Sequence, residues 1–149
     1  PSSYSLRAWS YVFSTTSEVL PALGQTALIA LGSTCISMII GVPAGRALGL
    51  YQFRGKAVIE ILILAPMIVP GIAVALGLHV VFLKLGLAGS VIGVMIVHLI
   101  PTLPYMVLVM SGIFSNYNPA AEAQARSLGA NPFQAFYYVT LPAILPATV

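Results

Sequence analysis

Few side chains in this sequence could carry out acid–base or metal chemistry, and they are scattered. Among 149 residues there are three acidic side chains, all glutamate, two histidines and one cysteine. His79 and His98 could bind a metal or transfer a proton, because imidazole titrates near neutral pH. Neither has a carboxylate or a cysteine nearby in the chain to complete a metal site. A membrane enzyme or metal-binding membrane protein that uses these two histidines is the alternative interpretation.

Other signatures of catalysis are missing from the sequence. It has no glycine-rich phosphate loop with a following lysine, no serine or cysteine nucleophile beside a base, and no pair of carboxylates. We therefore expect no catalytic residue, no metal site and no cofactor in this chain.

The composition is that of a membrane protein. Hydrophobic residues make up 59% of the chain, charged residues only 6%, and the mean hydropathy is +1.01. Soluble domains carry about 25% charged residues, so a water-soluble enzyme is excluded. Disordered chains are poor in apolar residues, so a disordered chain is excluded as well. The six basic residues are scattered singly, which argues against a nucleic-acid-binding surface.

The charges divide the chain into three apolar intervals. Residues 19–45, 61–83 and 85–121 contain no charged side chain, and each exceeds the roughly 20 residues that cross a bilayer as a helix. The apolar residues run continuously, which excludes alternating strands. The sequence predicts an all-α, polytopic helical bundle in the bilayer. We expect its membrane spans at 24–46, 60–83 and 91–114.

Basic residues collect on one side of these spans, which indicates the cytoplasmic side. The link between the first two spans and the segment after the third are therefore predicted to be cytoplasmic, and residues 1–22 to lie outside. The cytoplasmic group comprises Arg46, Arg54, Lys56 and Arg126, against Arg7 and Lys84 on the other side.

Prolines fall near the middle of two neighbouring spans, where they would break the helices. Freed backbone groups in lipid need neighbours or water, so breaks at matched depth are typical of a midplane pathway. Pro66 and Pro70 lie in the second span and Pro101 and Pro104 in the third. The residues predicted to line a pathway are Pro70, His98, Thr102 and Tyr105.

The first span also carries glycines spaced four apart, at Gly41, Gly45 and Gly49. They share one helix face and would let a neighbouring backbone approach closely. Packing between helices is the favoured interpretation, and a contact with another subunit is the alternative.

Residues 118–142 form a polar segment with a repeated helix-start pattern. Asn118 and Pro119 would cap a first short helix that Gly129 ends, with Glu122 and Arg126 paired at i and i+4. Asn131 and Pro132 would open a second helix, interrupted at Pro142, with Phe133, Phe136, Tyr137 and Thr140 at helical spacing. This predicts a cytoplasmic helix, glycine turn, helix unit.

The segment resembles the cytoplasmic loop of the permease subunits of binding-protein-dependent ABC importers. In that family a Gly is followed after nine residues by an aliphatic residue, any residue, Leu and Pro, and here Gly129 precedes Val139, Leu141 and Pro142 at that spacing. The resemblance covers about residues 4–149. The family's acid falls at Ala123 and its first alanine at Gln124, whereas Glu122 stands one residue earlier.

The resemblance implies a membrane-spanning, non-enzymatic subunit that forms a solute pathway. It also implies coupling of that pathway to an ABC ATPase, which would bind ATP and Mg²⁺. A second permease subunit, an extracytoplasmic solute-binding protein and the bilayer would be the other partners. Coupling residues by this resemblance are Glu122, Ala123, Gln124, Ala125, Arg126, Gly129, Val139, Leu141 and Pro142.

The subgroup that handles polyamines, ferric iron, thiamine or aminoalkylphosphonates is the most similar, and it implies a small charged solute such as a polyamine. The expected location is the inner (plasma) membrane of a bacterial cell, as a multi-pass protein. Three spans are fewer than the five or six of the family. The chain is therefore expected to be a fragment of the type I permease fold, with spans missing at both ends.

Overall fold

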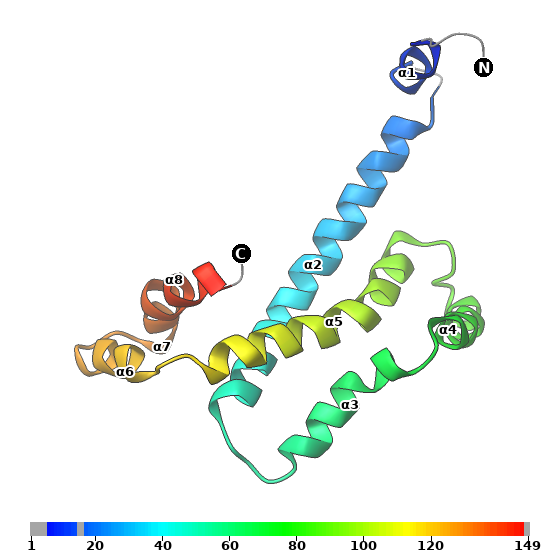
Figure 1. The fold of residues 1–149 in the computed structure, drawn as a ribbon. Coiled ribbons are helices and arrows are strands. Elements are labelled where there is room, and N and C mark those ends of the chain that lie inside the picture. The colour runs from blue at the N-terminus through cyan, green and yellow to red at the C-terminus, as the bar shows by residue number, and fades with distance from the viewer. Residues whose placement is uncertain (1–5, 15–16, 148–149) are drawn as a thin grey trace.

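A computed structural model describes residues 6–14 and 17–147, and all the regular secondary structure in these residues is helical. This confirms the predicted all-α class. Figure 1 shows two long helices, a bent pair beside them and a compact C-terminal arm. In chain order the elements are α1 Arg7–Val12, α2 Val19–Leu50, α3 Lys56–Ile68, α4 Gly71–Leu85, α5 Val91–Ser115, α6 Ala120–Ser127, α7 Pro132–Ala135, the π-helix η1 Phe136–Thr140, α8 Leu141–Ile144 and the 3-10 helix η2 Leu145–Ala147.

The long helices α2 and α5 pack along one another and run in the same direction (Figure 1). A Cβ added at Gly41 would lie 2.4 Å from Met106, and one at Gly45 would lie 2.5 Å from Met110. Each methionine is 65 positions after its glycine. This offset stays constant along the helices, which occurs only when the two helices are parallel. The prediction that the glycine face serves helix packing is confirmed. A third glycine of the face, Gly49, meets Phe114 and Ser111 in the same way.

Helix α2 is longer than the span expected at 24–46. Its 32 residues extend from Val19 to Leu50, which corresponds to about 48 Å at about 1.5 Å per residue. Pro43 lies inside the helix without ending it. The packing of Gly41 and Gly45 against α5, on either side of this proline, explains why the helix continues.

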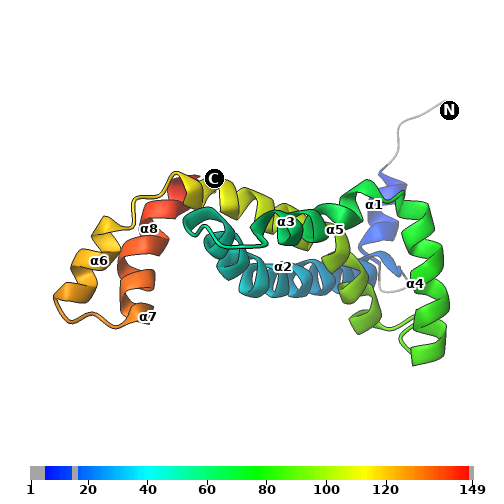
Figure 2. The same cartoon turned by 90° about the horizontal axis from the view of Figure 1, so that it is seen from below.

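The segment expected to span at 60–83 is two helices with a sharp bend between them. Helices α3 and α4 meet at 93°, and Figure 2 shows them nearly perpendicular. Val69, the residue before Pro70, has φ −74° and ψ 132°. Proline disfavours the helical conformation of the preceding residue, so the break predicted at Pro70 is confirmed. Pro66, by contrast, stays inside α3.

The break predicted in the third span is wrong. Helix α5 is continuous from Val91 to Ser115, with Pro101 and Pro104 both inside it. Its contacts with α2 lie on both sides of these prolines, since Met95 faces Gly32 and Met106 faces Gly41. Tertiary packing therefore outweighs the local cost of each proline.

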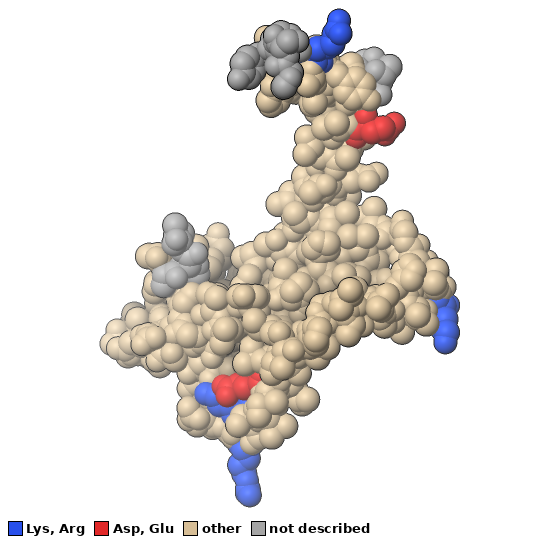
Figure 3. All heavy atoms as spheres, turned by 45° about the vertical axis from the view of Figure 1, so that its right-hand side comes forward, with Lys and Arg blue, Asp and Glu red and all other residues tan. Residues whose placement is uncertain are grey.

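The surface of the molecule is apolar over most of its area. Figure 3 shows charged side chains at the extremities of the visible face and none across its middle. Large aliphatic side chains are exposed on the described part of the chain, among them Ile39 at 73% and Ile68 at 80%. Helices α2 and α5 are long and apolar enough to cross a membrane, and the bent pair α3–α4 is a third such unit. An apolar surface of this extent is the one that lipid covers.

The C-terminal arm comprises α6, α7, η1, α8 and η2. It packs on α2 and α5. Met110 and Phe114 of α5 form a buried cluster with Ile144 of α8. The predicted interruption at Pro142 is wrong, because α8 continues directly from η1 with Pro142 in its first turn.

Candidate functional site

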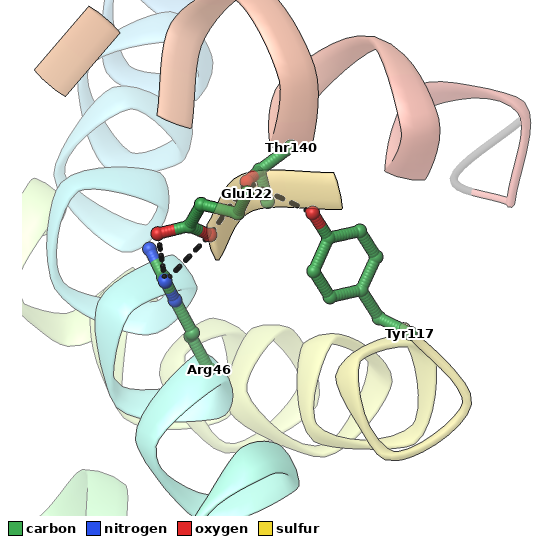
Figure 4. Close-up of polar contacts among 4 residues, drawn as sticks. All are labelled: Arg46, Tyr117, Glu122 and Thr140. Atoms are coloured by element: carbon green, nitrogen blue, oxygen red, sulfur yellow. Dashed lines mark hydrogen bonds and ion pairs between the residues drawn. The ribbon is translucent and has the colours of Figure 1, made fainter. Parts of the chain in front are cut away.

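The carboxylate of Glu122 lies at the centre of a polar cluster (Figure 4). Arg46 donates from Nη2 to both carboxylate oxygens, at 2.8 Å each. Thr140 donates from Oγ1 to Oε2 at 2.8 Å. The hydroxyl of Tyr117 lies 3.1 Å from the same Oγ1. Since the single hydroxyl proton of Thr140 is used by the carboxylate, Tyr117 is the donor.

The four residues of this cluster come from four parts of the chain. Arg46 lies near the end of α2, Tyr117 just after α5, Glu122 on α6 and Thr140 at the end of η1. The cluster therefore ties the first helix of the C-terminal arm to its second helix and to α2.

The predicted i, i+4 pair of Glu122 with Arg126 is wrong. Among the described residues, the ion pair of this carboxylate is with Arg46. Glu122 is 7% exposed, on the inward side of α6, whereas Arg126 is exposed. An exposed i, i+4 pair contributes only about 0.3–0.5 kcal/mol, so a buried, multiply bonded alternative wins.

Aromatic rings shield the ion pair from solvent. The guanidinium carbon of Arg46 lies 6.0 Å from the ring centre of Phe114 and 5.7 Å from that of Phe136. Both distances are within the range of cation–π attraction. Burial by itself raises the pKa of Glu122, but the hydrogen bonds from Arg46 and Thr140 and the charges of Arg46 and Arg126 outweigh it. The pKa therefore lies below its ordinary value, and Glu122 is ionised at neutral pH.

The π-helix decides which aromatic residues face inward. A π-helix has more residues per turn than an α-helix, and Phe133, Phe136, Tyr137 and Thr140 do not share the single face that α-helical spacing would give them. Phe136 is half-buried and Thr140 is buried. Phe133 and Tyr137 are exposed at 74% and 51% and stack on each other instead.

The second cap and the turn of this segment follow the sequence, whereas α6 begins one residue later than predicted, with Pro119 as its N-cap residue. Asn131 accepts from the backbone of Gln134, whose side chain accepts from the backbone of Asn131, so the predicted cap is a full capping box. Asn118 bonds the backbone N–H of Ala120 at 3.0 Å. Gly129 has φ +95°, which confirms the predicted positive-φ turn.

The outer face of the C-terminal arm is formed by residues other than Glu122. Ala123 and Gln124, at the positions of the family's acid and first alanine, are exposed, and Leu128 is 88% exposed. One helical residue corresponds to about 100° of rotation, so the acid one place earlier faces the protein interior. Of the other residues predicted to couple, Arg126, Gly129 and Pro142 are exposed, and Ala125, Val139 and Leu141 are half-buried.

Three of the four predicted pathway residues line two cavities beside α5. His98 and Tyr105 line one of about 510 Å³ at the bend between α3 and α4. Pro70 lies at this bend, between the lining residues Val69 and Gly71. Thr102 lines a second cavity, of about 520 Å³, between α2, α5 and α8. Tyr105 contributes to both cavities.

The two histidines line different cavities, and nothing in the described residues gathers ligands around them. His98 bonds the Val94 carbonyl at 2.8 Å through Nδ1, and His79 lines a separate cavity of about 220 Å³. Within residues 6–14 and 17–147, no group of three or more His, Cys, Asp or Glu side chains is placed to hold a metal.

Sequence reasoning missed three members of the polar cluster. The sequence places Arg46 only in the cytoplasmic basic group and predicts no polar role for Tyr117 or Thr140. Charge balance was the available signal, because Arg46 and Glu122 are basic and acidic residues predicted on the same side of the bilayer. The inward position of Thr140 depends on the π-helix, which the sequence pattern did not predict.

Comparison with known proteins gives a consistent result. Residues 37–149 match the family described as "Binding-protein-dependent transport system inner membrane component". The chain is 30% identical to the molybdate/tungstate transport system permease protein WtpB of Pyrococcus abyssi, with 87% of this chain and 52% of the relative covered. It is 31% identical to the molybdenum transport system permease protein ModB of Mycobacterium tuberculosis, with 96% and 58% covered.

A third relative is named for a different solute. The spermidine/putrescine transport system permease protein PotC of Escherichia coli is 26% identical, with 93% of this chain and 53% of the relative covered. The chain thus spans about half the length of the curated relatives it matches. The family match covers most of the chain, including the polar cluster, all of α5 and the C-terminal part of α2. The chain is a multi-pass inner-membrane protein and belongs to the permease subunits of the binding-protein-dependent ABC importers.

Proposed function

We propose that the chain is part of a permease whose residues 118–142 dock on an ABC ATPase and couple ATP hydrolysis to solute movement. The observation that carries the proposal is the arrangement of the C-terminal arm. Its inner side is fixed to α2 through Glu122, and its outer side, with Gln124 and Leu128, is exposed. A segment that is bonded to the membrane helices on one face and exposed on the other can transmit a displacement from a soluble partner to those helices.

The partners follow from the family and from the size of the chain. An ATPase that binds ATP and Mg²⁺, a second permease subunit and an extracytoplasmic solute-binding protein complete the importer. A chain half as long as its relatives needs further membrane helices to enclose a pathway.

Chain direction supports three membrane crossings, at about 24–46, 60–83 and 91–114. Helices α2 and α5 run parallel, so the link between them must return the chain across the bilayer. Helix α3 has 13 residues, about 20 Å, and is too short to do this alone. The bent pair α3–α4 is therefore a broken span, and both long helices end on the cytoplasmic side, next to the C-terminal arm.

The solute pathway would run beside α5, past Pro70, His98, Thr102 and Tyr105. The cavity at the α3–α4 bend is lined by one imidazole and one phenol and by no carboxylate. His98 donates from Nδ1 to the Val94 carbonyl, so in the neutral imidazole the free Nε2 accepts a hydrogen bond, whereas the Tyr105 hydroxyl can donate or accept. Relatives are named for both oxyanions and polyamines, so a small charged solute is proposed.

Co-purification tests the coupling proposal. The full-length protein is solubilised with its genomically neighbouring ATPase, with and without the outer-face substitutions Gln124→Glu and Leu128→Glu. We expect the ATPase to be retained by the unmodified protein and lost with the substitutions. Retention that does not depend on residues 118–142 would overturn the proposal. Uptake of molybdate, sulfate and spermidine by the reconstituted importer then identifies the solute.

A further inference from the structure

The buried contact that helix α6 makes with the rest of the protein is made by a charged side chain. Of its eight residues, Glu122 is the one that is buried. The apolar cluster beneath the arm draws its residues from α2, α5, η1 and α8 and from Tyr117, with none from α6. The position of α6 relative to the membrane helices therefore depends on what Glu122 bonds.

The partner of Glu122 lies where α2 is most tightly fixed. Arg46 follows Gly45, whose added Cβ would lie 2.5 Å from the Met110 side chain and 3.0 Å from the Val107 carbonyl. Three residues further on, Gly49 is in the same kind of contact with Phe114 and the Ser111 carbonyl. At this level α2 and α5 are in backbone contact and cannot shift separately.

Thr140 links the same carboxylate to the second helix of the arm, which is the continuous run of α7, η1 and α8. It is fully buried and bonds both Glu122 and Tyr117. One turn later, Ile144 is 3% exposed in the apolar cluster with Met110 and Phe114. The second helix is thus fixed to α5 by packing, and α6 is fixed to both through Glu122.

We propose that Arg46 is a positioning residue for coupling: its ion pair with Glu122 makes α2 move with α6 when the ATPase displaces the arm. The inference rests on the proposed function. It concerns a residue 76 positions from Glu122 and outside the arm. Without the ion pair, α6 keeps its Thr140 bond to the second helix but loses its direct link to α2, so less of its displacement reaches the membrane helices.

Coupling is measured as solute transported per ATP hydrolysed, in the reconstituted full importer with Cys35→Ala as background. Arg46→Gln and Glu122→Gln each remove the ion pair and keep most of the side-chain volume. We expect the ratio to fall on the order of tenfold in each variant, and no further in the double variant, because the two residues act as a unit. The matched control is Lys56→Gln with Glu60→Gln, which breaks the half-buried 3.9 Å pair on α3, outside the arm, and should leave the ratio unchanged.

A covalent link in place of the ion pair tests whether Arg46 acts by connecting α2 to α6. In Arg46→Cys with Glu122→Cys, a bifunctional maleimide bridges the two positions. Recovery of the ratio on bridging supports the inference, because a merely structural defect in the ion pair would not be repaired by a link between α2 and α6.

Three results would reject either the role of Arg46 or the proposed docking on the ATPase. An unchanged ratio in both single variants, or a bridged protein that stays uncoupled, would reject the role of Arg46. ATPase retention on the affinity resin, checked in the same samples, keeps this distinct from failure of the docking proposal. Loss of the ATPase from the unmodified protein would reject the proposed function, and this inference with it.

Discussion

Ser37 of α2 and Thr102 of α5 are hydrogen-bonded at 2.8 Å, 65 positions apart in the chain. Thr102 also donates to the His98 carbonyl at 2.7 Å, so Ser37 donates to Thr102. The same offset of 65 recurs where Gly41 and Gly45 meet Met106 and Met110. One polar contact and two close packing contacts thus fix a single register between parallel helices.

The first prediction concerns this topology. In a Cys35→Ser background, Gln52→Cys after α2 and Ala88→Cys before α5 should react with a membrane-impermeant thiol reagent from opposite sides of the membrane. Both positions are exposed, so exposure does not differ between them. Labelling of both cysteines from the same side would show that α3–α4 is a re-entrant loop.

The second prediction concerns the close approach of α2 and α5. Gly45→Ala places a Cβ 3.0 Å from the Ser111 nitrogen and the Val107 carbonyl, which are backbone atoms that cannot move aside. We expect a loss of about 1–3 kcal/mol in unfolding free energy, measured by denaturation in detergent micelles. Gly24→Ala, on the same helix with nothing within 4 Å, is the control and should be neutral or slightly stabilising. Equal effects at the two sites would contradict the observed packing.

The third prediction concerns pH. Because the pKa of Glu122 is lowered in the folded state, its ion pair contributes stability that is fully present above the ordinary carboxyl pKa. That contribution is lost as the pH falls from about 4.5 through the lower folded-state pKa. Unfolding measured from pH 7 to pH 3 should therefore show a steeper acid loss in the unmodified protein than in Glu122→Gln. Parallel pH profiles would mean that Glu122 is not paired.

The fourth prediction concerns the turn at Gly129. A Cβ here would meet nothing within 4 Å, yet φ is +95°, where side-chain-bearing residues cost about 1–2 kcal/mol. Gly129→Ala and Gly129→Leu should therefore destabilise the arm by similar amounts, because the backbone angle and not side-chain size sets the cost. Proteolysis within residues 127–132 provides the measurement. A far larger effect of leucine than of alanine would place a steric neighbour at the turn.

Physical patterns in the sequence were sufficient for much of the architecture. Charge-free intervals longer than a bilayer span predicted helices in the membrane, because burying charge in lipid is costly and burying apolar side chains is not. The glycines of α2 and the turn at Gly129 were also readable. Each reflects a local requirement, close approach in one case and positive φ in the other, that only glycine meets.

Tertiary contacts decided the rest. Whether a proline breaks a helix depended on its neighbours: Pro70 bends the chain where the α3–α4 junction is open, whereas Pro101 and Pro104 stay helical beside α2. The partner of Glu122 depended on which of two arginines reached its buried side. Arg46 is brought there from another helix, through the register of α2 on α5 and the π-helical turn that points Thr140 inward. A sequence pattern records spacing along one helix, and these contacts join residues that only folding places side by side.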